Sequence, residues 1–377
     1  MILRSVWLGC LAAIVWGSTG WSGSPWVAEA CGQVVSDRQT QNVILITIDG
    51  LRWQEVFRGA EERLISESDG GVKDVPATKE AFWRSEIVDR RRTLMPFVWD
   101  VIARDGQLLG NRDRGSQARV LNNQHFSYPG YQEVLCGYPD ERVTSNDKIP
   151  NANITVLEWL SRRPEIGPRV AIFGSWDTFP AIINDQRSGL PINAGWQPLE
   201  VARDPQTLVE INRLTSELPR TWPGVRYDAI TAWGAREFFL VKHPRLLYLA
   251  LGEPGDWAHE GRYDQYLAAT QRCDRLIADL WQTAQSLPEY AGQTTLVLTV
   301  DHGRGRDGDG WKNHSTSIPG SDEIWIGVLG PDTPAAGDRQ GVTATQSQVA
   351  ATVAALLGAD YRAAVPQAGE ILPGVIK

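Results

Sequence analysis

The chain of 377 residues is poor in cysteine, with four in all. Three of them, Cys31, Cys136 and Cys273, follow the first thirty residues, and no two are closely spaced. Such an odd and scattered set forms neither a disulfide framework nor a zinc finger. At most one disulfide bridge is expected.

The chain also lacks an excess of basic residues and a long apolar run. Lys and Arg total 37 against 45 Asp and Glu, for a net charge of −8, and no long basic run is present. We therefore expect no duplex nucleic acid as a partner, because binding it requires clustered Lys and Arg. No segment beyond the N-terminus approaches 18 consecutive apolar residues, so we expect no membrane span in the mature chain. The 16 Trp are scattered and are interpreted as packing residues and pocket walls.

The first thirty residues have the pattern of a secretory signal peptide. Arg4 forms a short basic region, Val6 to Trp16 form an apolar run, and Ala28-Glu29-Ala30 is a small-x-small cleavage site. We predict a signal peptide at 1–30 and a secreted or periplasmic protein. The alternatives are a retained N-terminal anchor and lipid attachment at Cys31, which the acidic residue before the cleavage site disfavours.

From residue 40 onward, apolar runs alternate with helical segments. Strands are expected at 43–48, 169–174, 245–251, 294–300 and 324–329, and helices at 93–104, 155–161, 229–241, 263–281 and 349–357. This alternation predicts a doubly wound α/β fold with a mostly parallel central sheet. We expect one domain at 40–377, with a cap or insertion around 175–225, where the sequence is irregular and rich in Pro, Trp and Gly.

Residues 122–137 predict a loop that delivers one hydroxyl, that of Ser127, to the start of a short helix. Pro129 suits a first helical turn, Glu133 is expected in that turn, and Gly137 can end the helix. A serine at a helix N-terminus faces unpaired backbone N–H groups, which form an anion site. Taken alone, the segment is also typical of an ordinary turn.

Acids and histidines follow three of the expected strands, and a Gly-rich loop leads to one further histidine. These side chains are Asp49 after the first strand, Asp256 and His259 after the third, Asp301 and His302 after the fourth, and His314 after the loop. In open α/β sheets the binding crevice lies beyond the carboxyl ends of the strands. We therefore expect these groups to converge, although they are far apart in the sequence.

Mixed Asp and His ligation suits Zn²⁺, or another first-row divalent ion such as Mn²⁺, better than Mg²⁺ or Ca²⁺. Each cluster alone has an ordinary explanation as a turn, a helix N-terminus or a loop. Their coincidence with a serine at a helix start favours a metal site.

In order, these motifs resemble the alkaline phosphatase superfamily, and within it the type I phosphodiesterase/nucleotide pyrophosphatase-like branch. The resemblance rests on VILITIDGLR (43–52), SYPGY from Ser127 with Gly137 ten residues later, TVDHG (299–303), HEGRY from His259, His314 with IPGSDEIW (318–325), and TQSQVAAT (345–352). It covers about 42–358, with the middle insertion unmatched. It implies an alkaline-phosphatase-like three-layer α/β/α sandwich.

The resemblance also implies a role for each site residue. Ser127 would be the nucleophile, one divalent ion would be held by Asp49, Asp301 and His302 close to Ser127, and a second by Asp256, His259 and His314. One ion would ionise the serine, and the other would stabilise the leaving oxygen and activate water, through a phosphoserine intermediate. Asn146 or Asn151 would donate a hydrogen bond to a phosphoryl oxygen, and the sequence does not choose between them.

One position departs from the pattern of similar enzymes. They place an aspartate four residues before the histidine, where this chain has Gly255, and Asp256 stands three residues before His259. Three interpretations follow: Asp256 ligates, Glu253 substitutes, or the second ion is weakly held.

The favoured function is a secreted, metal-dependent hydrolase of small phosphate mono- or diesters. One alternative is a sulfatase relative, because Ser127-Tyr-Pro begins like a formylglycine site, although Tyr131 stands where Arg is expected. Another is a non-catalytic metal- or phosphate-binding protein, suggested by Gly255.

The choice between mono- and diester stays open at this stage. A monoester dianion calls for an additional cation. Arg304, Arg306 and Lys312 would supply it, or they are solvated loop charges.

Overall fold

The computed structural model describes residues 38–306 and 308–377. The predicted signal peptide and Cys31 lie outside the described residues. The strands are β1 (Asn42–Ile48), β2 (Gln107–Leu109), β3 (Gln117–Arg119), β4 (Val170–Gly174), β5 (Ile192–Ala194), β6 (Leu246–Leu251), β7 (Thr294–Thr299), β8 (Glu323–Ile324), β9 (Ile326–Leu329), β10 (Gly337–Asp338) and β11 (Thr343–Thr345). The helices are α1 (Trp53–Arg58), α2 (Glu67–Gly70), α3 (Val75–Phe82), α4 (Ile87–Leu94), α5 (Ala103–Asp105), α6 (Ser127–Cys136), α7 (Val156–Ser161), α8 (Phe179–Ile183), α9 (Asp185–Ser188), α10 (Pro205–Glu217), α11 (Asp228–Lys242), α12 (Glu253–His259), α13 (Tyr263–Gln285), α14 (Gln348–Leu356) and α15 (Tyr361–Ala364).

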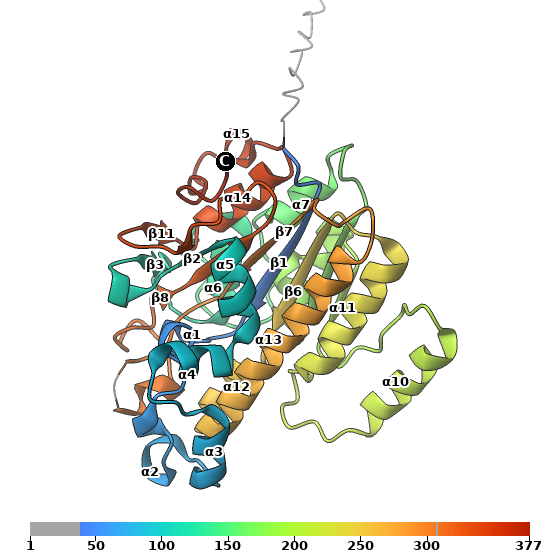
Figure 1. The fold of residues 1–377 in the computed structure, drawn as a ribbon. Coiled ribbons are helices and arrows are strands. Elements are labelled where there is room, and N and C mark those ends of the chain that lie inside the picture. Colours follow the sequence, from blue (N-terminus) through green and yellow to red (C-terminus); the bar gives the residue numbers. More distant parts are fainter. Residues whose placement is uncertain (1–37, 307) are drawn as a thin grey trace, which may run out of the picture. The chain divides into compact units, whose positions relative to one another are not determined.

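Within the described residues, eight strands form a central sheet in the order β10-β2-β9-β7-β1-β6-β4-β5, with β1 in its interior (Figure 1). Strands β7, β1, β6, β4 and β5 run parallel, whereas β9 is antiparallel to both β7 and β2. In this register Thr47 pairs with Thr299, and Ile48 pairs with Leu251. The carboxyl ends of β7, β1 and β6 therefore lie side by side.

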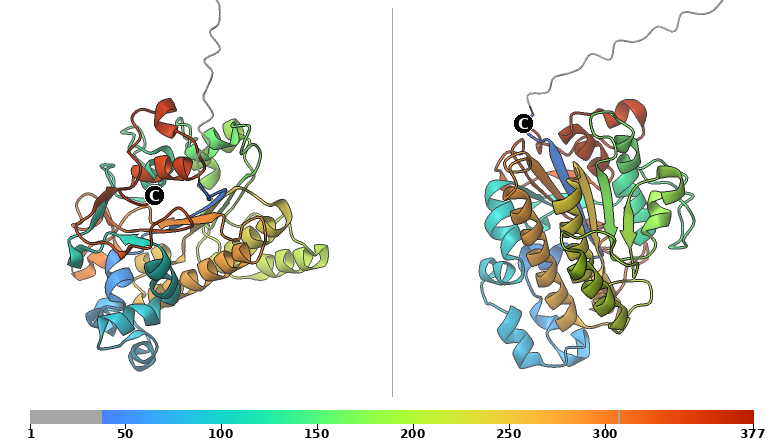
Figure 2. Two further views of the ribbon diagram at one scale, coloured as in Figure 1. Left: turned by 45° about the horizontal axis from the view of Figure 1, so that its top comes forward. Right: turned by 90° about the vertical axis from the view of Figure 1, so that its right-hand side faces the viewer.

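Helices cover both faces of the sheet (Figure 2). Helices α11 and α13 pack on one face, against β4, β6 and β7, and α7 and α14 pack on the other, against β4 and β1. Every residue of β1, β6 and β7 is buried, as expected for strands covered on both faces. These layers confirm the predicted α/β/α sandwich with a mostly parallel sheet.

The single helix expected at 93–104 was wrong. Helix α4 ends at Leu94, a π-helical stretch spans Val98–Ile102, and α5 follows. Pro96 explains the break, because proline has no N–H and disfavours helical backbone at the residue before it. Met95 accordingly leaves the helical region, with φ −134° and ψ 69°.

The segment around 175–225 contributes to both the sheet and the surface. Strand β5 pairs with β4 at the edge of the central sheet. Helix α10 in the same segment buries Thr215 and leaves most of its other side chains exposed or half-buried.

In the part of the chain that the structure describes, no helix is both long and apolar enough to span a membrane. Cys136 and Cys273 are both buried free thiols.

Candidate active site

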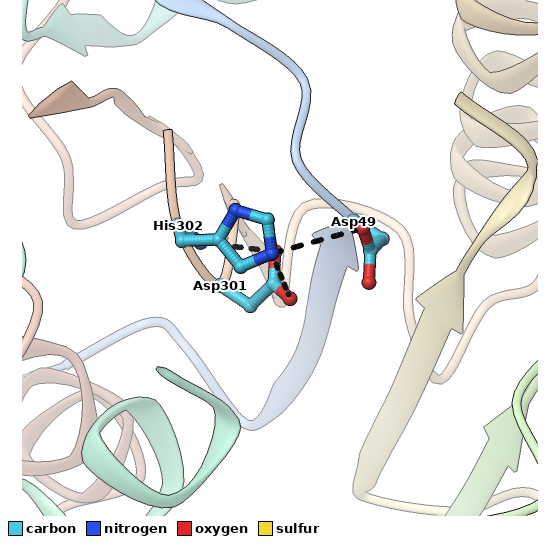
Figure 3. A group of neighbouring side chains, drawn as sticks. All are labelled: Asp49, Asp301 and His302. Atoms are coloured by element: carbon cyan, nitrogen blue, oxygen red, sulfur yellow. Dashed lines mark hydrogen bonds and ion pairs between the residues drawn. The ribbon is translucent and has the colours of Figure 1, made fainter. Parts of the chain in front are cut away.

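Asp49, Asp301 and His302 meet at the carboxyl ends of β1 and β7 (Figure 3). One ligand atom from each lies within 4.8 Å of the other two. His302 Nε2 is 3.4 Å from Asp301 Oδ2 and 3.9 Å from Asp49 Oδ1. Because β1 and β7 are neighbouring parallel strands, the residues that follow them are brought together by sheet register. We call these three residues the ligand trio.

Backbone contacts orient the trio. Asp301 Oδ1 accepts hydrogen bonds from the backbone N–H groups of Gly50 and His302, both at 2.9 Å. Asp301 Oδ2 is buried without a hydrogen-bond partner. His302 Nδ1 lies 2.8 Å from the Gly303 carbonyl, so Nδ1 carries the proton and the Nε2 lone pair faces the carboxylates. A buried, unpartnered carboxylate oxygen beside an imidazole lone pair fits a divalent transition-metal ion.

Burial shapes the charges of the trio. It raises the pKa of the Asp49 and Asp301 carboxyls and lowers the pKa of the His302 imidazole well below its ordinary value. The imidazole is therefore neutral at pH 7, as a metal ligand must be. The cost of burying two neighbouring carboxylates is the kind of cost that a bound cation offsets.

Ser127 faces the trio from the first residue of α6. Its Oγ is 3.3 Å from Asp49 Oδ2 and 3.4 Å from His302 Nε2. The glycine of the SYPG sequence permits this approach, because a Cβ at Gly130 would lie 2.2 Å from the Asp301 carbonyl oxygen. Gly137 ends the helix in the left-handed region at φ 80°, which confirms the predicted C-terminus.

The expectation that Glu133 lies in the first turn of this helix was wrong, because α6 begins at Ser127. Glu133 is buried and accepts hydrogen bonds from the backbone N–H groups of Leu121 and Asn122, from Asn122 Nδ2 and from Ser347 Oγ. It therefore holds the loop before Ser127 against α6 and the start of α14.

The predicted second ligand set converges less fully. His259 Nε2 and His314 Nε2 are 3.1 Å apart, and His314 Nδ1 lies 3.0 Å from the His125 carbonyl. Asp256 lines one pocket together with these two histidines. However, in the ranges 38–306 and 308–377 the ligand trio alone brings three such ligand atoms within 4.8 Å of one another. We call His259 and His314 the histidine pair.

Both imidazoles of the histidine pair are neutral at pH 7. Desolvation, followed by the nearby positive charge of Arg304, lowers the pKa of His259 to about 3 and that of His314 to about 2. Desolvation also raises the pKa of the Asp256 carboxyl well above its ordinary value, with the neighbouring Asp49 carboxylate adding to the effect.

A pocket of about 210 Å³ opens over these groups. Its wall includes Asp49, Ser127, Asn146, Asp256, His259 and His314, together with the aromatic side chains of Tyr131, Trp176 and Phe179. Asn146 and Asn151, between which the sequence did not choose, lie in different surroundings. Asn146 lines this pocket and accepts from Tyr128 N through Oδ1, whereas Asn151 Nδ2 donates to the Ile182 carbonyl.

Gly255, the position at which this chain differs from the pattern of similar enzymes, packs against the Asp49 side chain. A Cβ at Gly255 would lie 2.0 Å from Asp49 Oδ1, so the Asp49 carboxylate occupies the space that a side chain there would need. Glu253 bonds elsewhere, because its carboxylate accepts from Arg272 and from the backbone N–H of Asp228.

The three loop cations have separate partners. Arg304 is buried and donates to the backbone carbonyls of Gly50, Gly255 and Lys312. Arg306 pairs with Glu323, and Lys312 Nζ pairs with Asp309 at 2.6 Å. The pocket wall includes none of these three side chains among the described residues.

Sequence reasoning did not single out several residues that shape the site. Tyr131 OH lies 3.4 Å from Asp49 Oδ2, and Gln346 Nε2 donates to the carbonyls of Val300 and Asp301. Trp176 and Phe179 form the pocket wall from the irregular segment after β4. Tyr131 and Gln346 lay within quoted motifs, but only their three-dimensional contacts reveal what they hold.

Solved structures with the same fold include hydrolases of the alkaline phosphatase superfamily. Wild-type alkaline phosphatase PafA aligns with a TM-score of 0.57 at 10% identity, over 90% of this chain and 99% of that one. The phosphonate monoester hydrolase of Agrobacterium radiobacter aligns at 0.51 and 13% identity, over 89% and 79%. BT1596, a 2-O GAG sulfatase, aligns at 0.50 and 14% identity, over 89% and 75%.

These alignments confirm the alkaline-phosphatase-like core that the resemblance implied. At such identities they establish the fold alone. No family model and no curated protein matches the chain.

Proposed function

We propose that this chain is an exported, metal-dependent hydrolase of phosphate esters that acts through a phosphoserine intermediate on Ser127. One observation carries the proposal: the Ser127 hydroxyl lies 3.3 Å and 3.4 Å from atoms of two members of the ligand trio. Export rests on the signal-peptide pattern of residues 1–30. The hydrolases that share the fold act on different esters, so the ester class belongs to the proposal.

The ligand trio would hold the ion, with Zn²⁺ expected and Mn²⁺ as the alternative, because one imidazole and two carboxylates form its donor set. When bound, the ion lowers the pKa of the nearby serine hydroxyl and polarises a phosphoryl oxygen. Residues of the chain itself would carry out the remaining steps. Ser127 Oγ would lose its proton to solvent and attack phosphorus as the bond to the leaving alkoxide breaks, and that alkoxide would take up a proton from solvent. Water would then hydrolyse the phosphoserine, which releases phosphate from a monoester substrate and a phosphate monoester from a diester.

Asn146 and the start of α6 position the phosphoryl group. Asn146 Oδ1 is engaged by Tyr128 N, which leaves the Nδ2 donor for a phosphoryl oxygen. At the start of α6, Tyr128 N donates to Asn146 Oδ1 and Pro129 has no N–H, so the helix contributes the positive end of its dipole rather than a set of free N–H groups. The aromatic wall of Trp176 and Phe179 faces the organic group of the ester.

The deciding experiment compares the mature protein with Ser127→Ala on p-nitrophenyl phosphate and bis-p-nitrophenyl phosphate. We expect turnover of one or both by the wild type and a phosphorylated Ser127 peptide after acid quench. Turnover that survives Ser127→Ala would remove Ser127 as nucleophile. The sulfatase alternative predicts a formylglycine mass for this peptide, and an unmodified serine rules it out. The binding-protein alternative requires ion binding without turnover.

A further inference from the structure

A protein cation lies beside Asp49 and beside the backbone of Gly255, the position at which similar enzymes carry an aspartate. The Arg304 guanidinium is buried, with Nη2 3.6 Å from Asp49 Oδ1 and 3.0 Å from the Gly255 carbonyl. Resting on the function proposed above, we propose that the site takes one divalent ion, at the ligand trio, and that Arg304 supplies the second positive charge permanently. This proposal departs from the expectation of two ions.

The second set of ligands lacks a carboxylate. Gly255 contributes no ligand, and the space that a side chain there would fill is already taken by Asp49 Oδ1. Neither Glu253 nor Asp256 replaces the missing carboxylate. Glu253 is held by Arg272 at 3.1 Å, and Asp256 forms no close trio with the histidine pair in the described part of the chain.

The hydrogen bonds of the histidine pair are satisfied without an ion. His314 Nδ1 donates to the His125 carbonyl, so its Nε2 carries a lone pair. His259 Nε2 lies 3.1 Å away, a normal distance for an N–H···N hydrogen bond between the two rings. Catalytic zinc sites ordinarily use three protein ligands. Two imidazoles alone form a weaker site.

Three backbone carbonyls hold the Arg304 guanidinium in place. Nε donates to the Gly50 carbonyl at 3.0 Å and Nη1 to the Lys312 carbonyl at 2.9 Å. Together with the Gly255 bond, these contacts join the segments that carry Asp49, Asp256 and His314. A guanidinium stays charged inside proteins, and a buried charge close to a carboxylate acts with little screening. Arg304 is thus a positioning residue that also supplies a fixed field.

Ion counting tests the first half of the proposal. The full mature chain is stripped with chelator, titrated calorimetrically with Zn²⁺ and, separately, with Mn²⁺, and examined by anomalous scattering from crystals. We expect one ion at the ligand trio in the wild type and in His314→Ala, with affinities within about 3-fold, and a loss of about 100-fold or more in Asp301→Asn. Two ions in the wild type, one of which His314→Ala removes, would overturn the proposal, as would no ion at the trio.

A matched pair of variants tests the charge of Arg304. Arg304→Lys and Arg304→Gln both break the three-carbonyl network, but only lysine keeps the charge. With inorganic phosphate as the probe on ion-loaded protein, we expect roughly 10-fold weaker binding in Arg304→Gln and about 3-fold in Arg304→Lys. Equal losses would refute the charge role. Thermal melts establish that both variants fold, and if neither does, the ion count still decides the proposal.

The ion count and the turnover assay can fail independently of each other. One bound ion without turnover would refute the phosphate-ester function and leave the one-ion proposal standing. Two bound ions with turnover would do the reverse.

Discussion

The ligand trio and the histidine pair lie at the same end of the sheet but are built on different supports. Asp49 and Asp301 directly follow adjacent parallel strands, and Asp301 and His302 are fully buried. His259 is the last residue of the short helix α12, and His314 lies in a loop beyond Arg304. Sheet register fixes the first group, whereas one helix end and one loop hold the second.

This difference has a chemical consequence. The trio leaves a buried carboxylate oxygen without a partner, which a cation satisfies. The histidine pair is satisfied internally, through a ring-to-ring contact and the His125 carbonyl. We infer that ligands that follow adjacent strands are pre-organised for an ion, whereas the histidine pair, held by one helix end and one loop, is not.

The largest expected effect falls on the serine beside the trio. Ser127→Ala should lower kcat/KM for p-nitrophenyl phosphate by roughly 10⁴-fold or more, because it removes the nucleophile. Ser216→Ala, at an exposed serine on α10, is the control and should leave the rate unchanged. Ion content measured on the same samples should stay the same, and a lost ion would mean that the serine acts through metal binding.

A direct comparison of the two groups comes next. We expect His302→Ala to lower kcat/KM by roughly 10³-fold and His259→Ala by about 10-fold, because only the first removes a trio ligand. Steady-state kinetics on both variants, with metal analysis, provides the measurement. Equal losses would erase the distinction between the two groups.

The asparagine in the pocket should have an intermediate effect. Asn146→Ala should lower kcat by roughly 10²-fold, because it removes a donor aimed at the phosphoryl group. Asn151→Ala is the matched control, since its Nδ2 donates to the Ile182 carbonyl in the buried scaffold. It should lower the melting temperature and leave kcat nearly unchanged. The reverse pattern would assign the role to Asn151.

Replacing Gly255, which lies beside Asp49, should have a smaller effect than the substitutions above, and the effect should be on ion affinity. Gly255→Ala introduces a Cβ that would lie 2.0 Å from Asp49 Oδ1 and forces this carboxylate to turn away. We expect ion affinity at the trio to fall by about 10-fold. Gly252→Ala, whose Cβ would meet Val225 Cγ1 at 3.1 Å, is the control in the same turn. Unchanged affinity in Gly255→Ala would show that Asp49 does not depend on this space.

The smallest effect concerns the support of α12, which carries His259. Asp228 accepts from the backbone N–H groups of Gly252 and Glu253, and desolvation, with the Glu253 charge, raises its pKa to about 7. Between about pH 4 and 7 the native state therefore keeps a proton that the unfolded chain releases, so this group's contribution to stability falls as pH rises.

Urea unfolding of Asp228→Asn across pH 5 to 7 measures this contribution. The stability of the variant should fall less steeply with pH than that of the wild type, by about 1.4 kcal/mol per pH unit at most. Asp105→Asn, at a carboxyl whose pKa a hydrogen bond from Arg104 lowers, should not flatten the slope. Parallel slopes for Asp228→Asn and the wild type would contradict the assignment.

Much of the fold was predictable from the sequence because strands and helices are indicated by local residue patterns. The apolar runs at 43–48, 245–251 and 294–300 became β1, β6 and β7, and the rule for strand ends brought Asp49 and Asp301 together. The break before Pro96 follows from the same local chemistry, but the helix predicted at 93–104 ran through it.

The sequence by itself determined the α/β class, the convergence of the strand-end acids and histidines, and the serine at a helix start, since these follow from periodicity and from neighbouring residues. The resemblance implied the grouping of Asp49, Asp301 and His302 around one ion. The tertiary structure decided the roles of Arg304, Glu133 and Gly255. Arg304 was a candidate substrate contact but bonds to three backbone carbonyls from distant segments. The space at Gly255 is filled by a side chain about two hundred positions away in the chain. Such roles depend on which backbone groups and side chains packing brings within reach, and no local pattern encodes that.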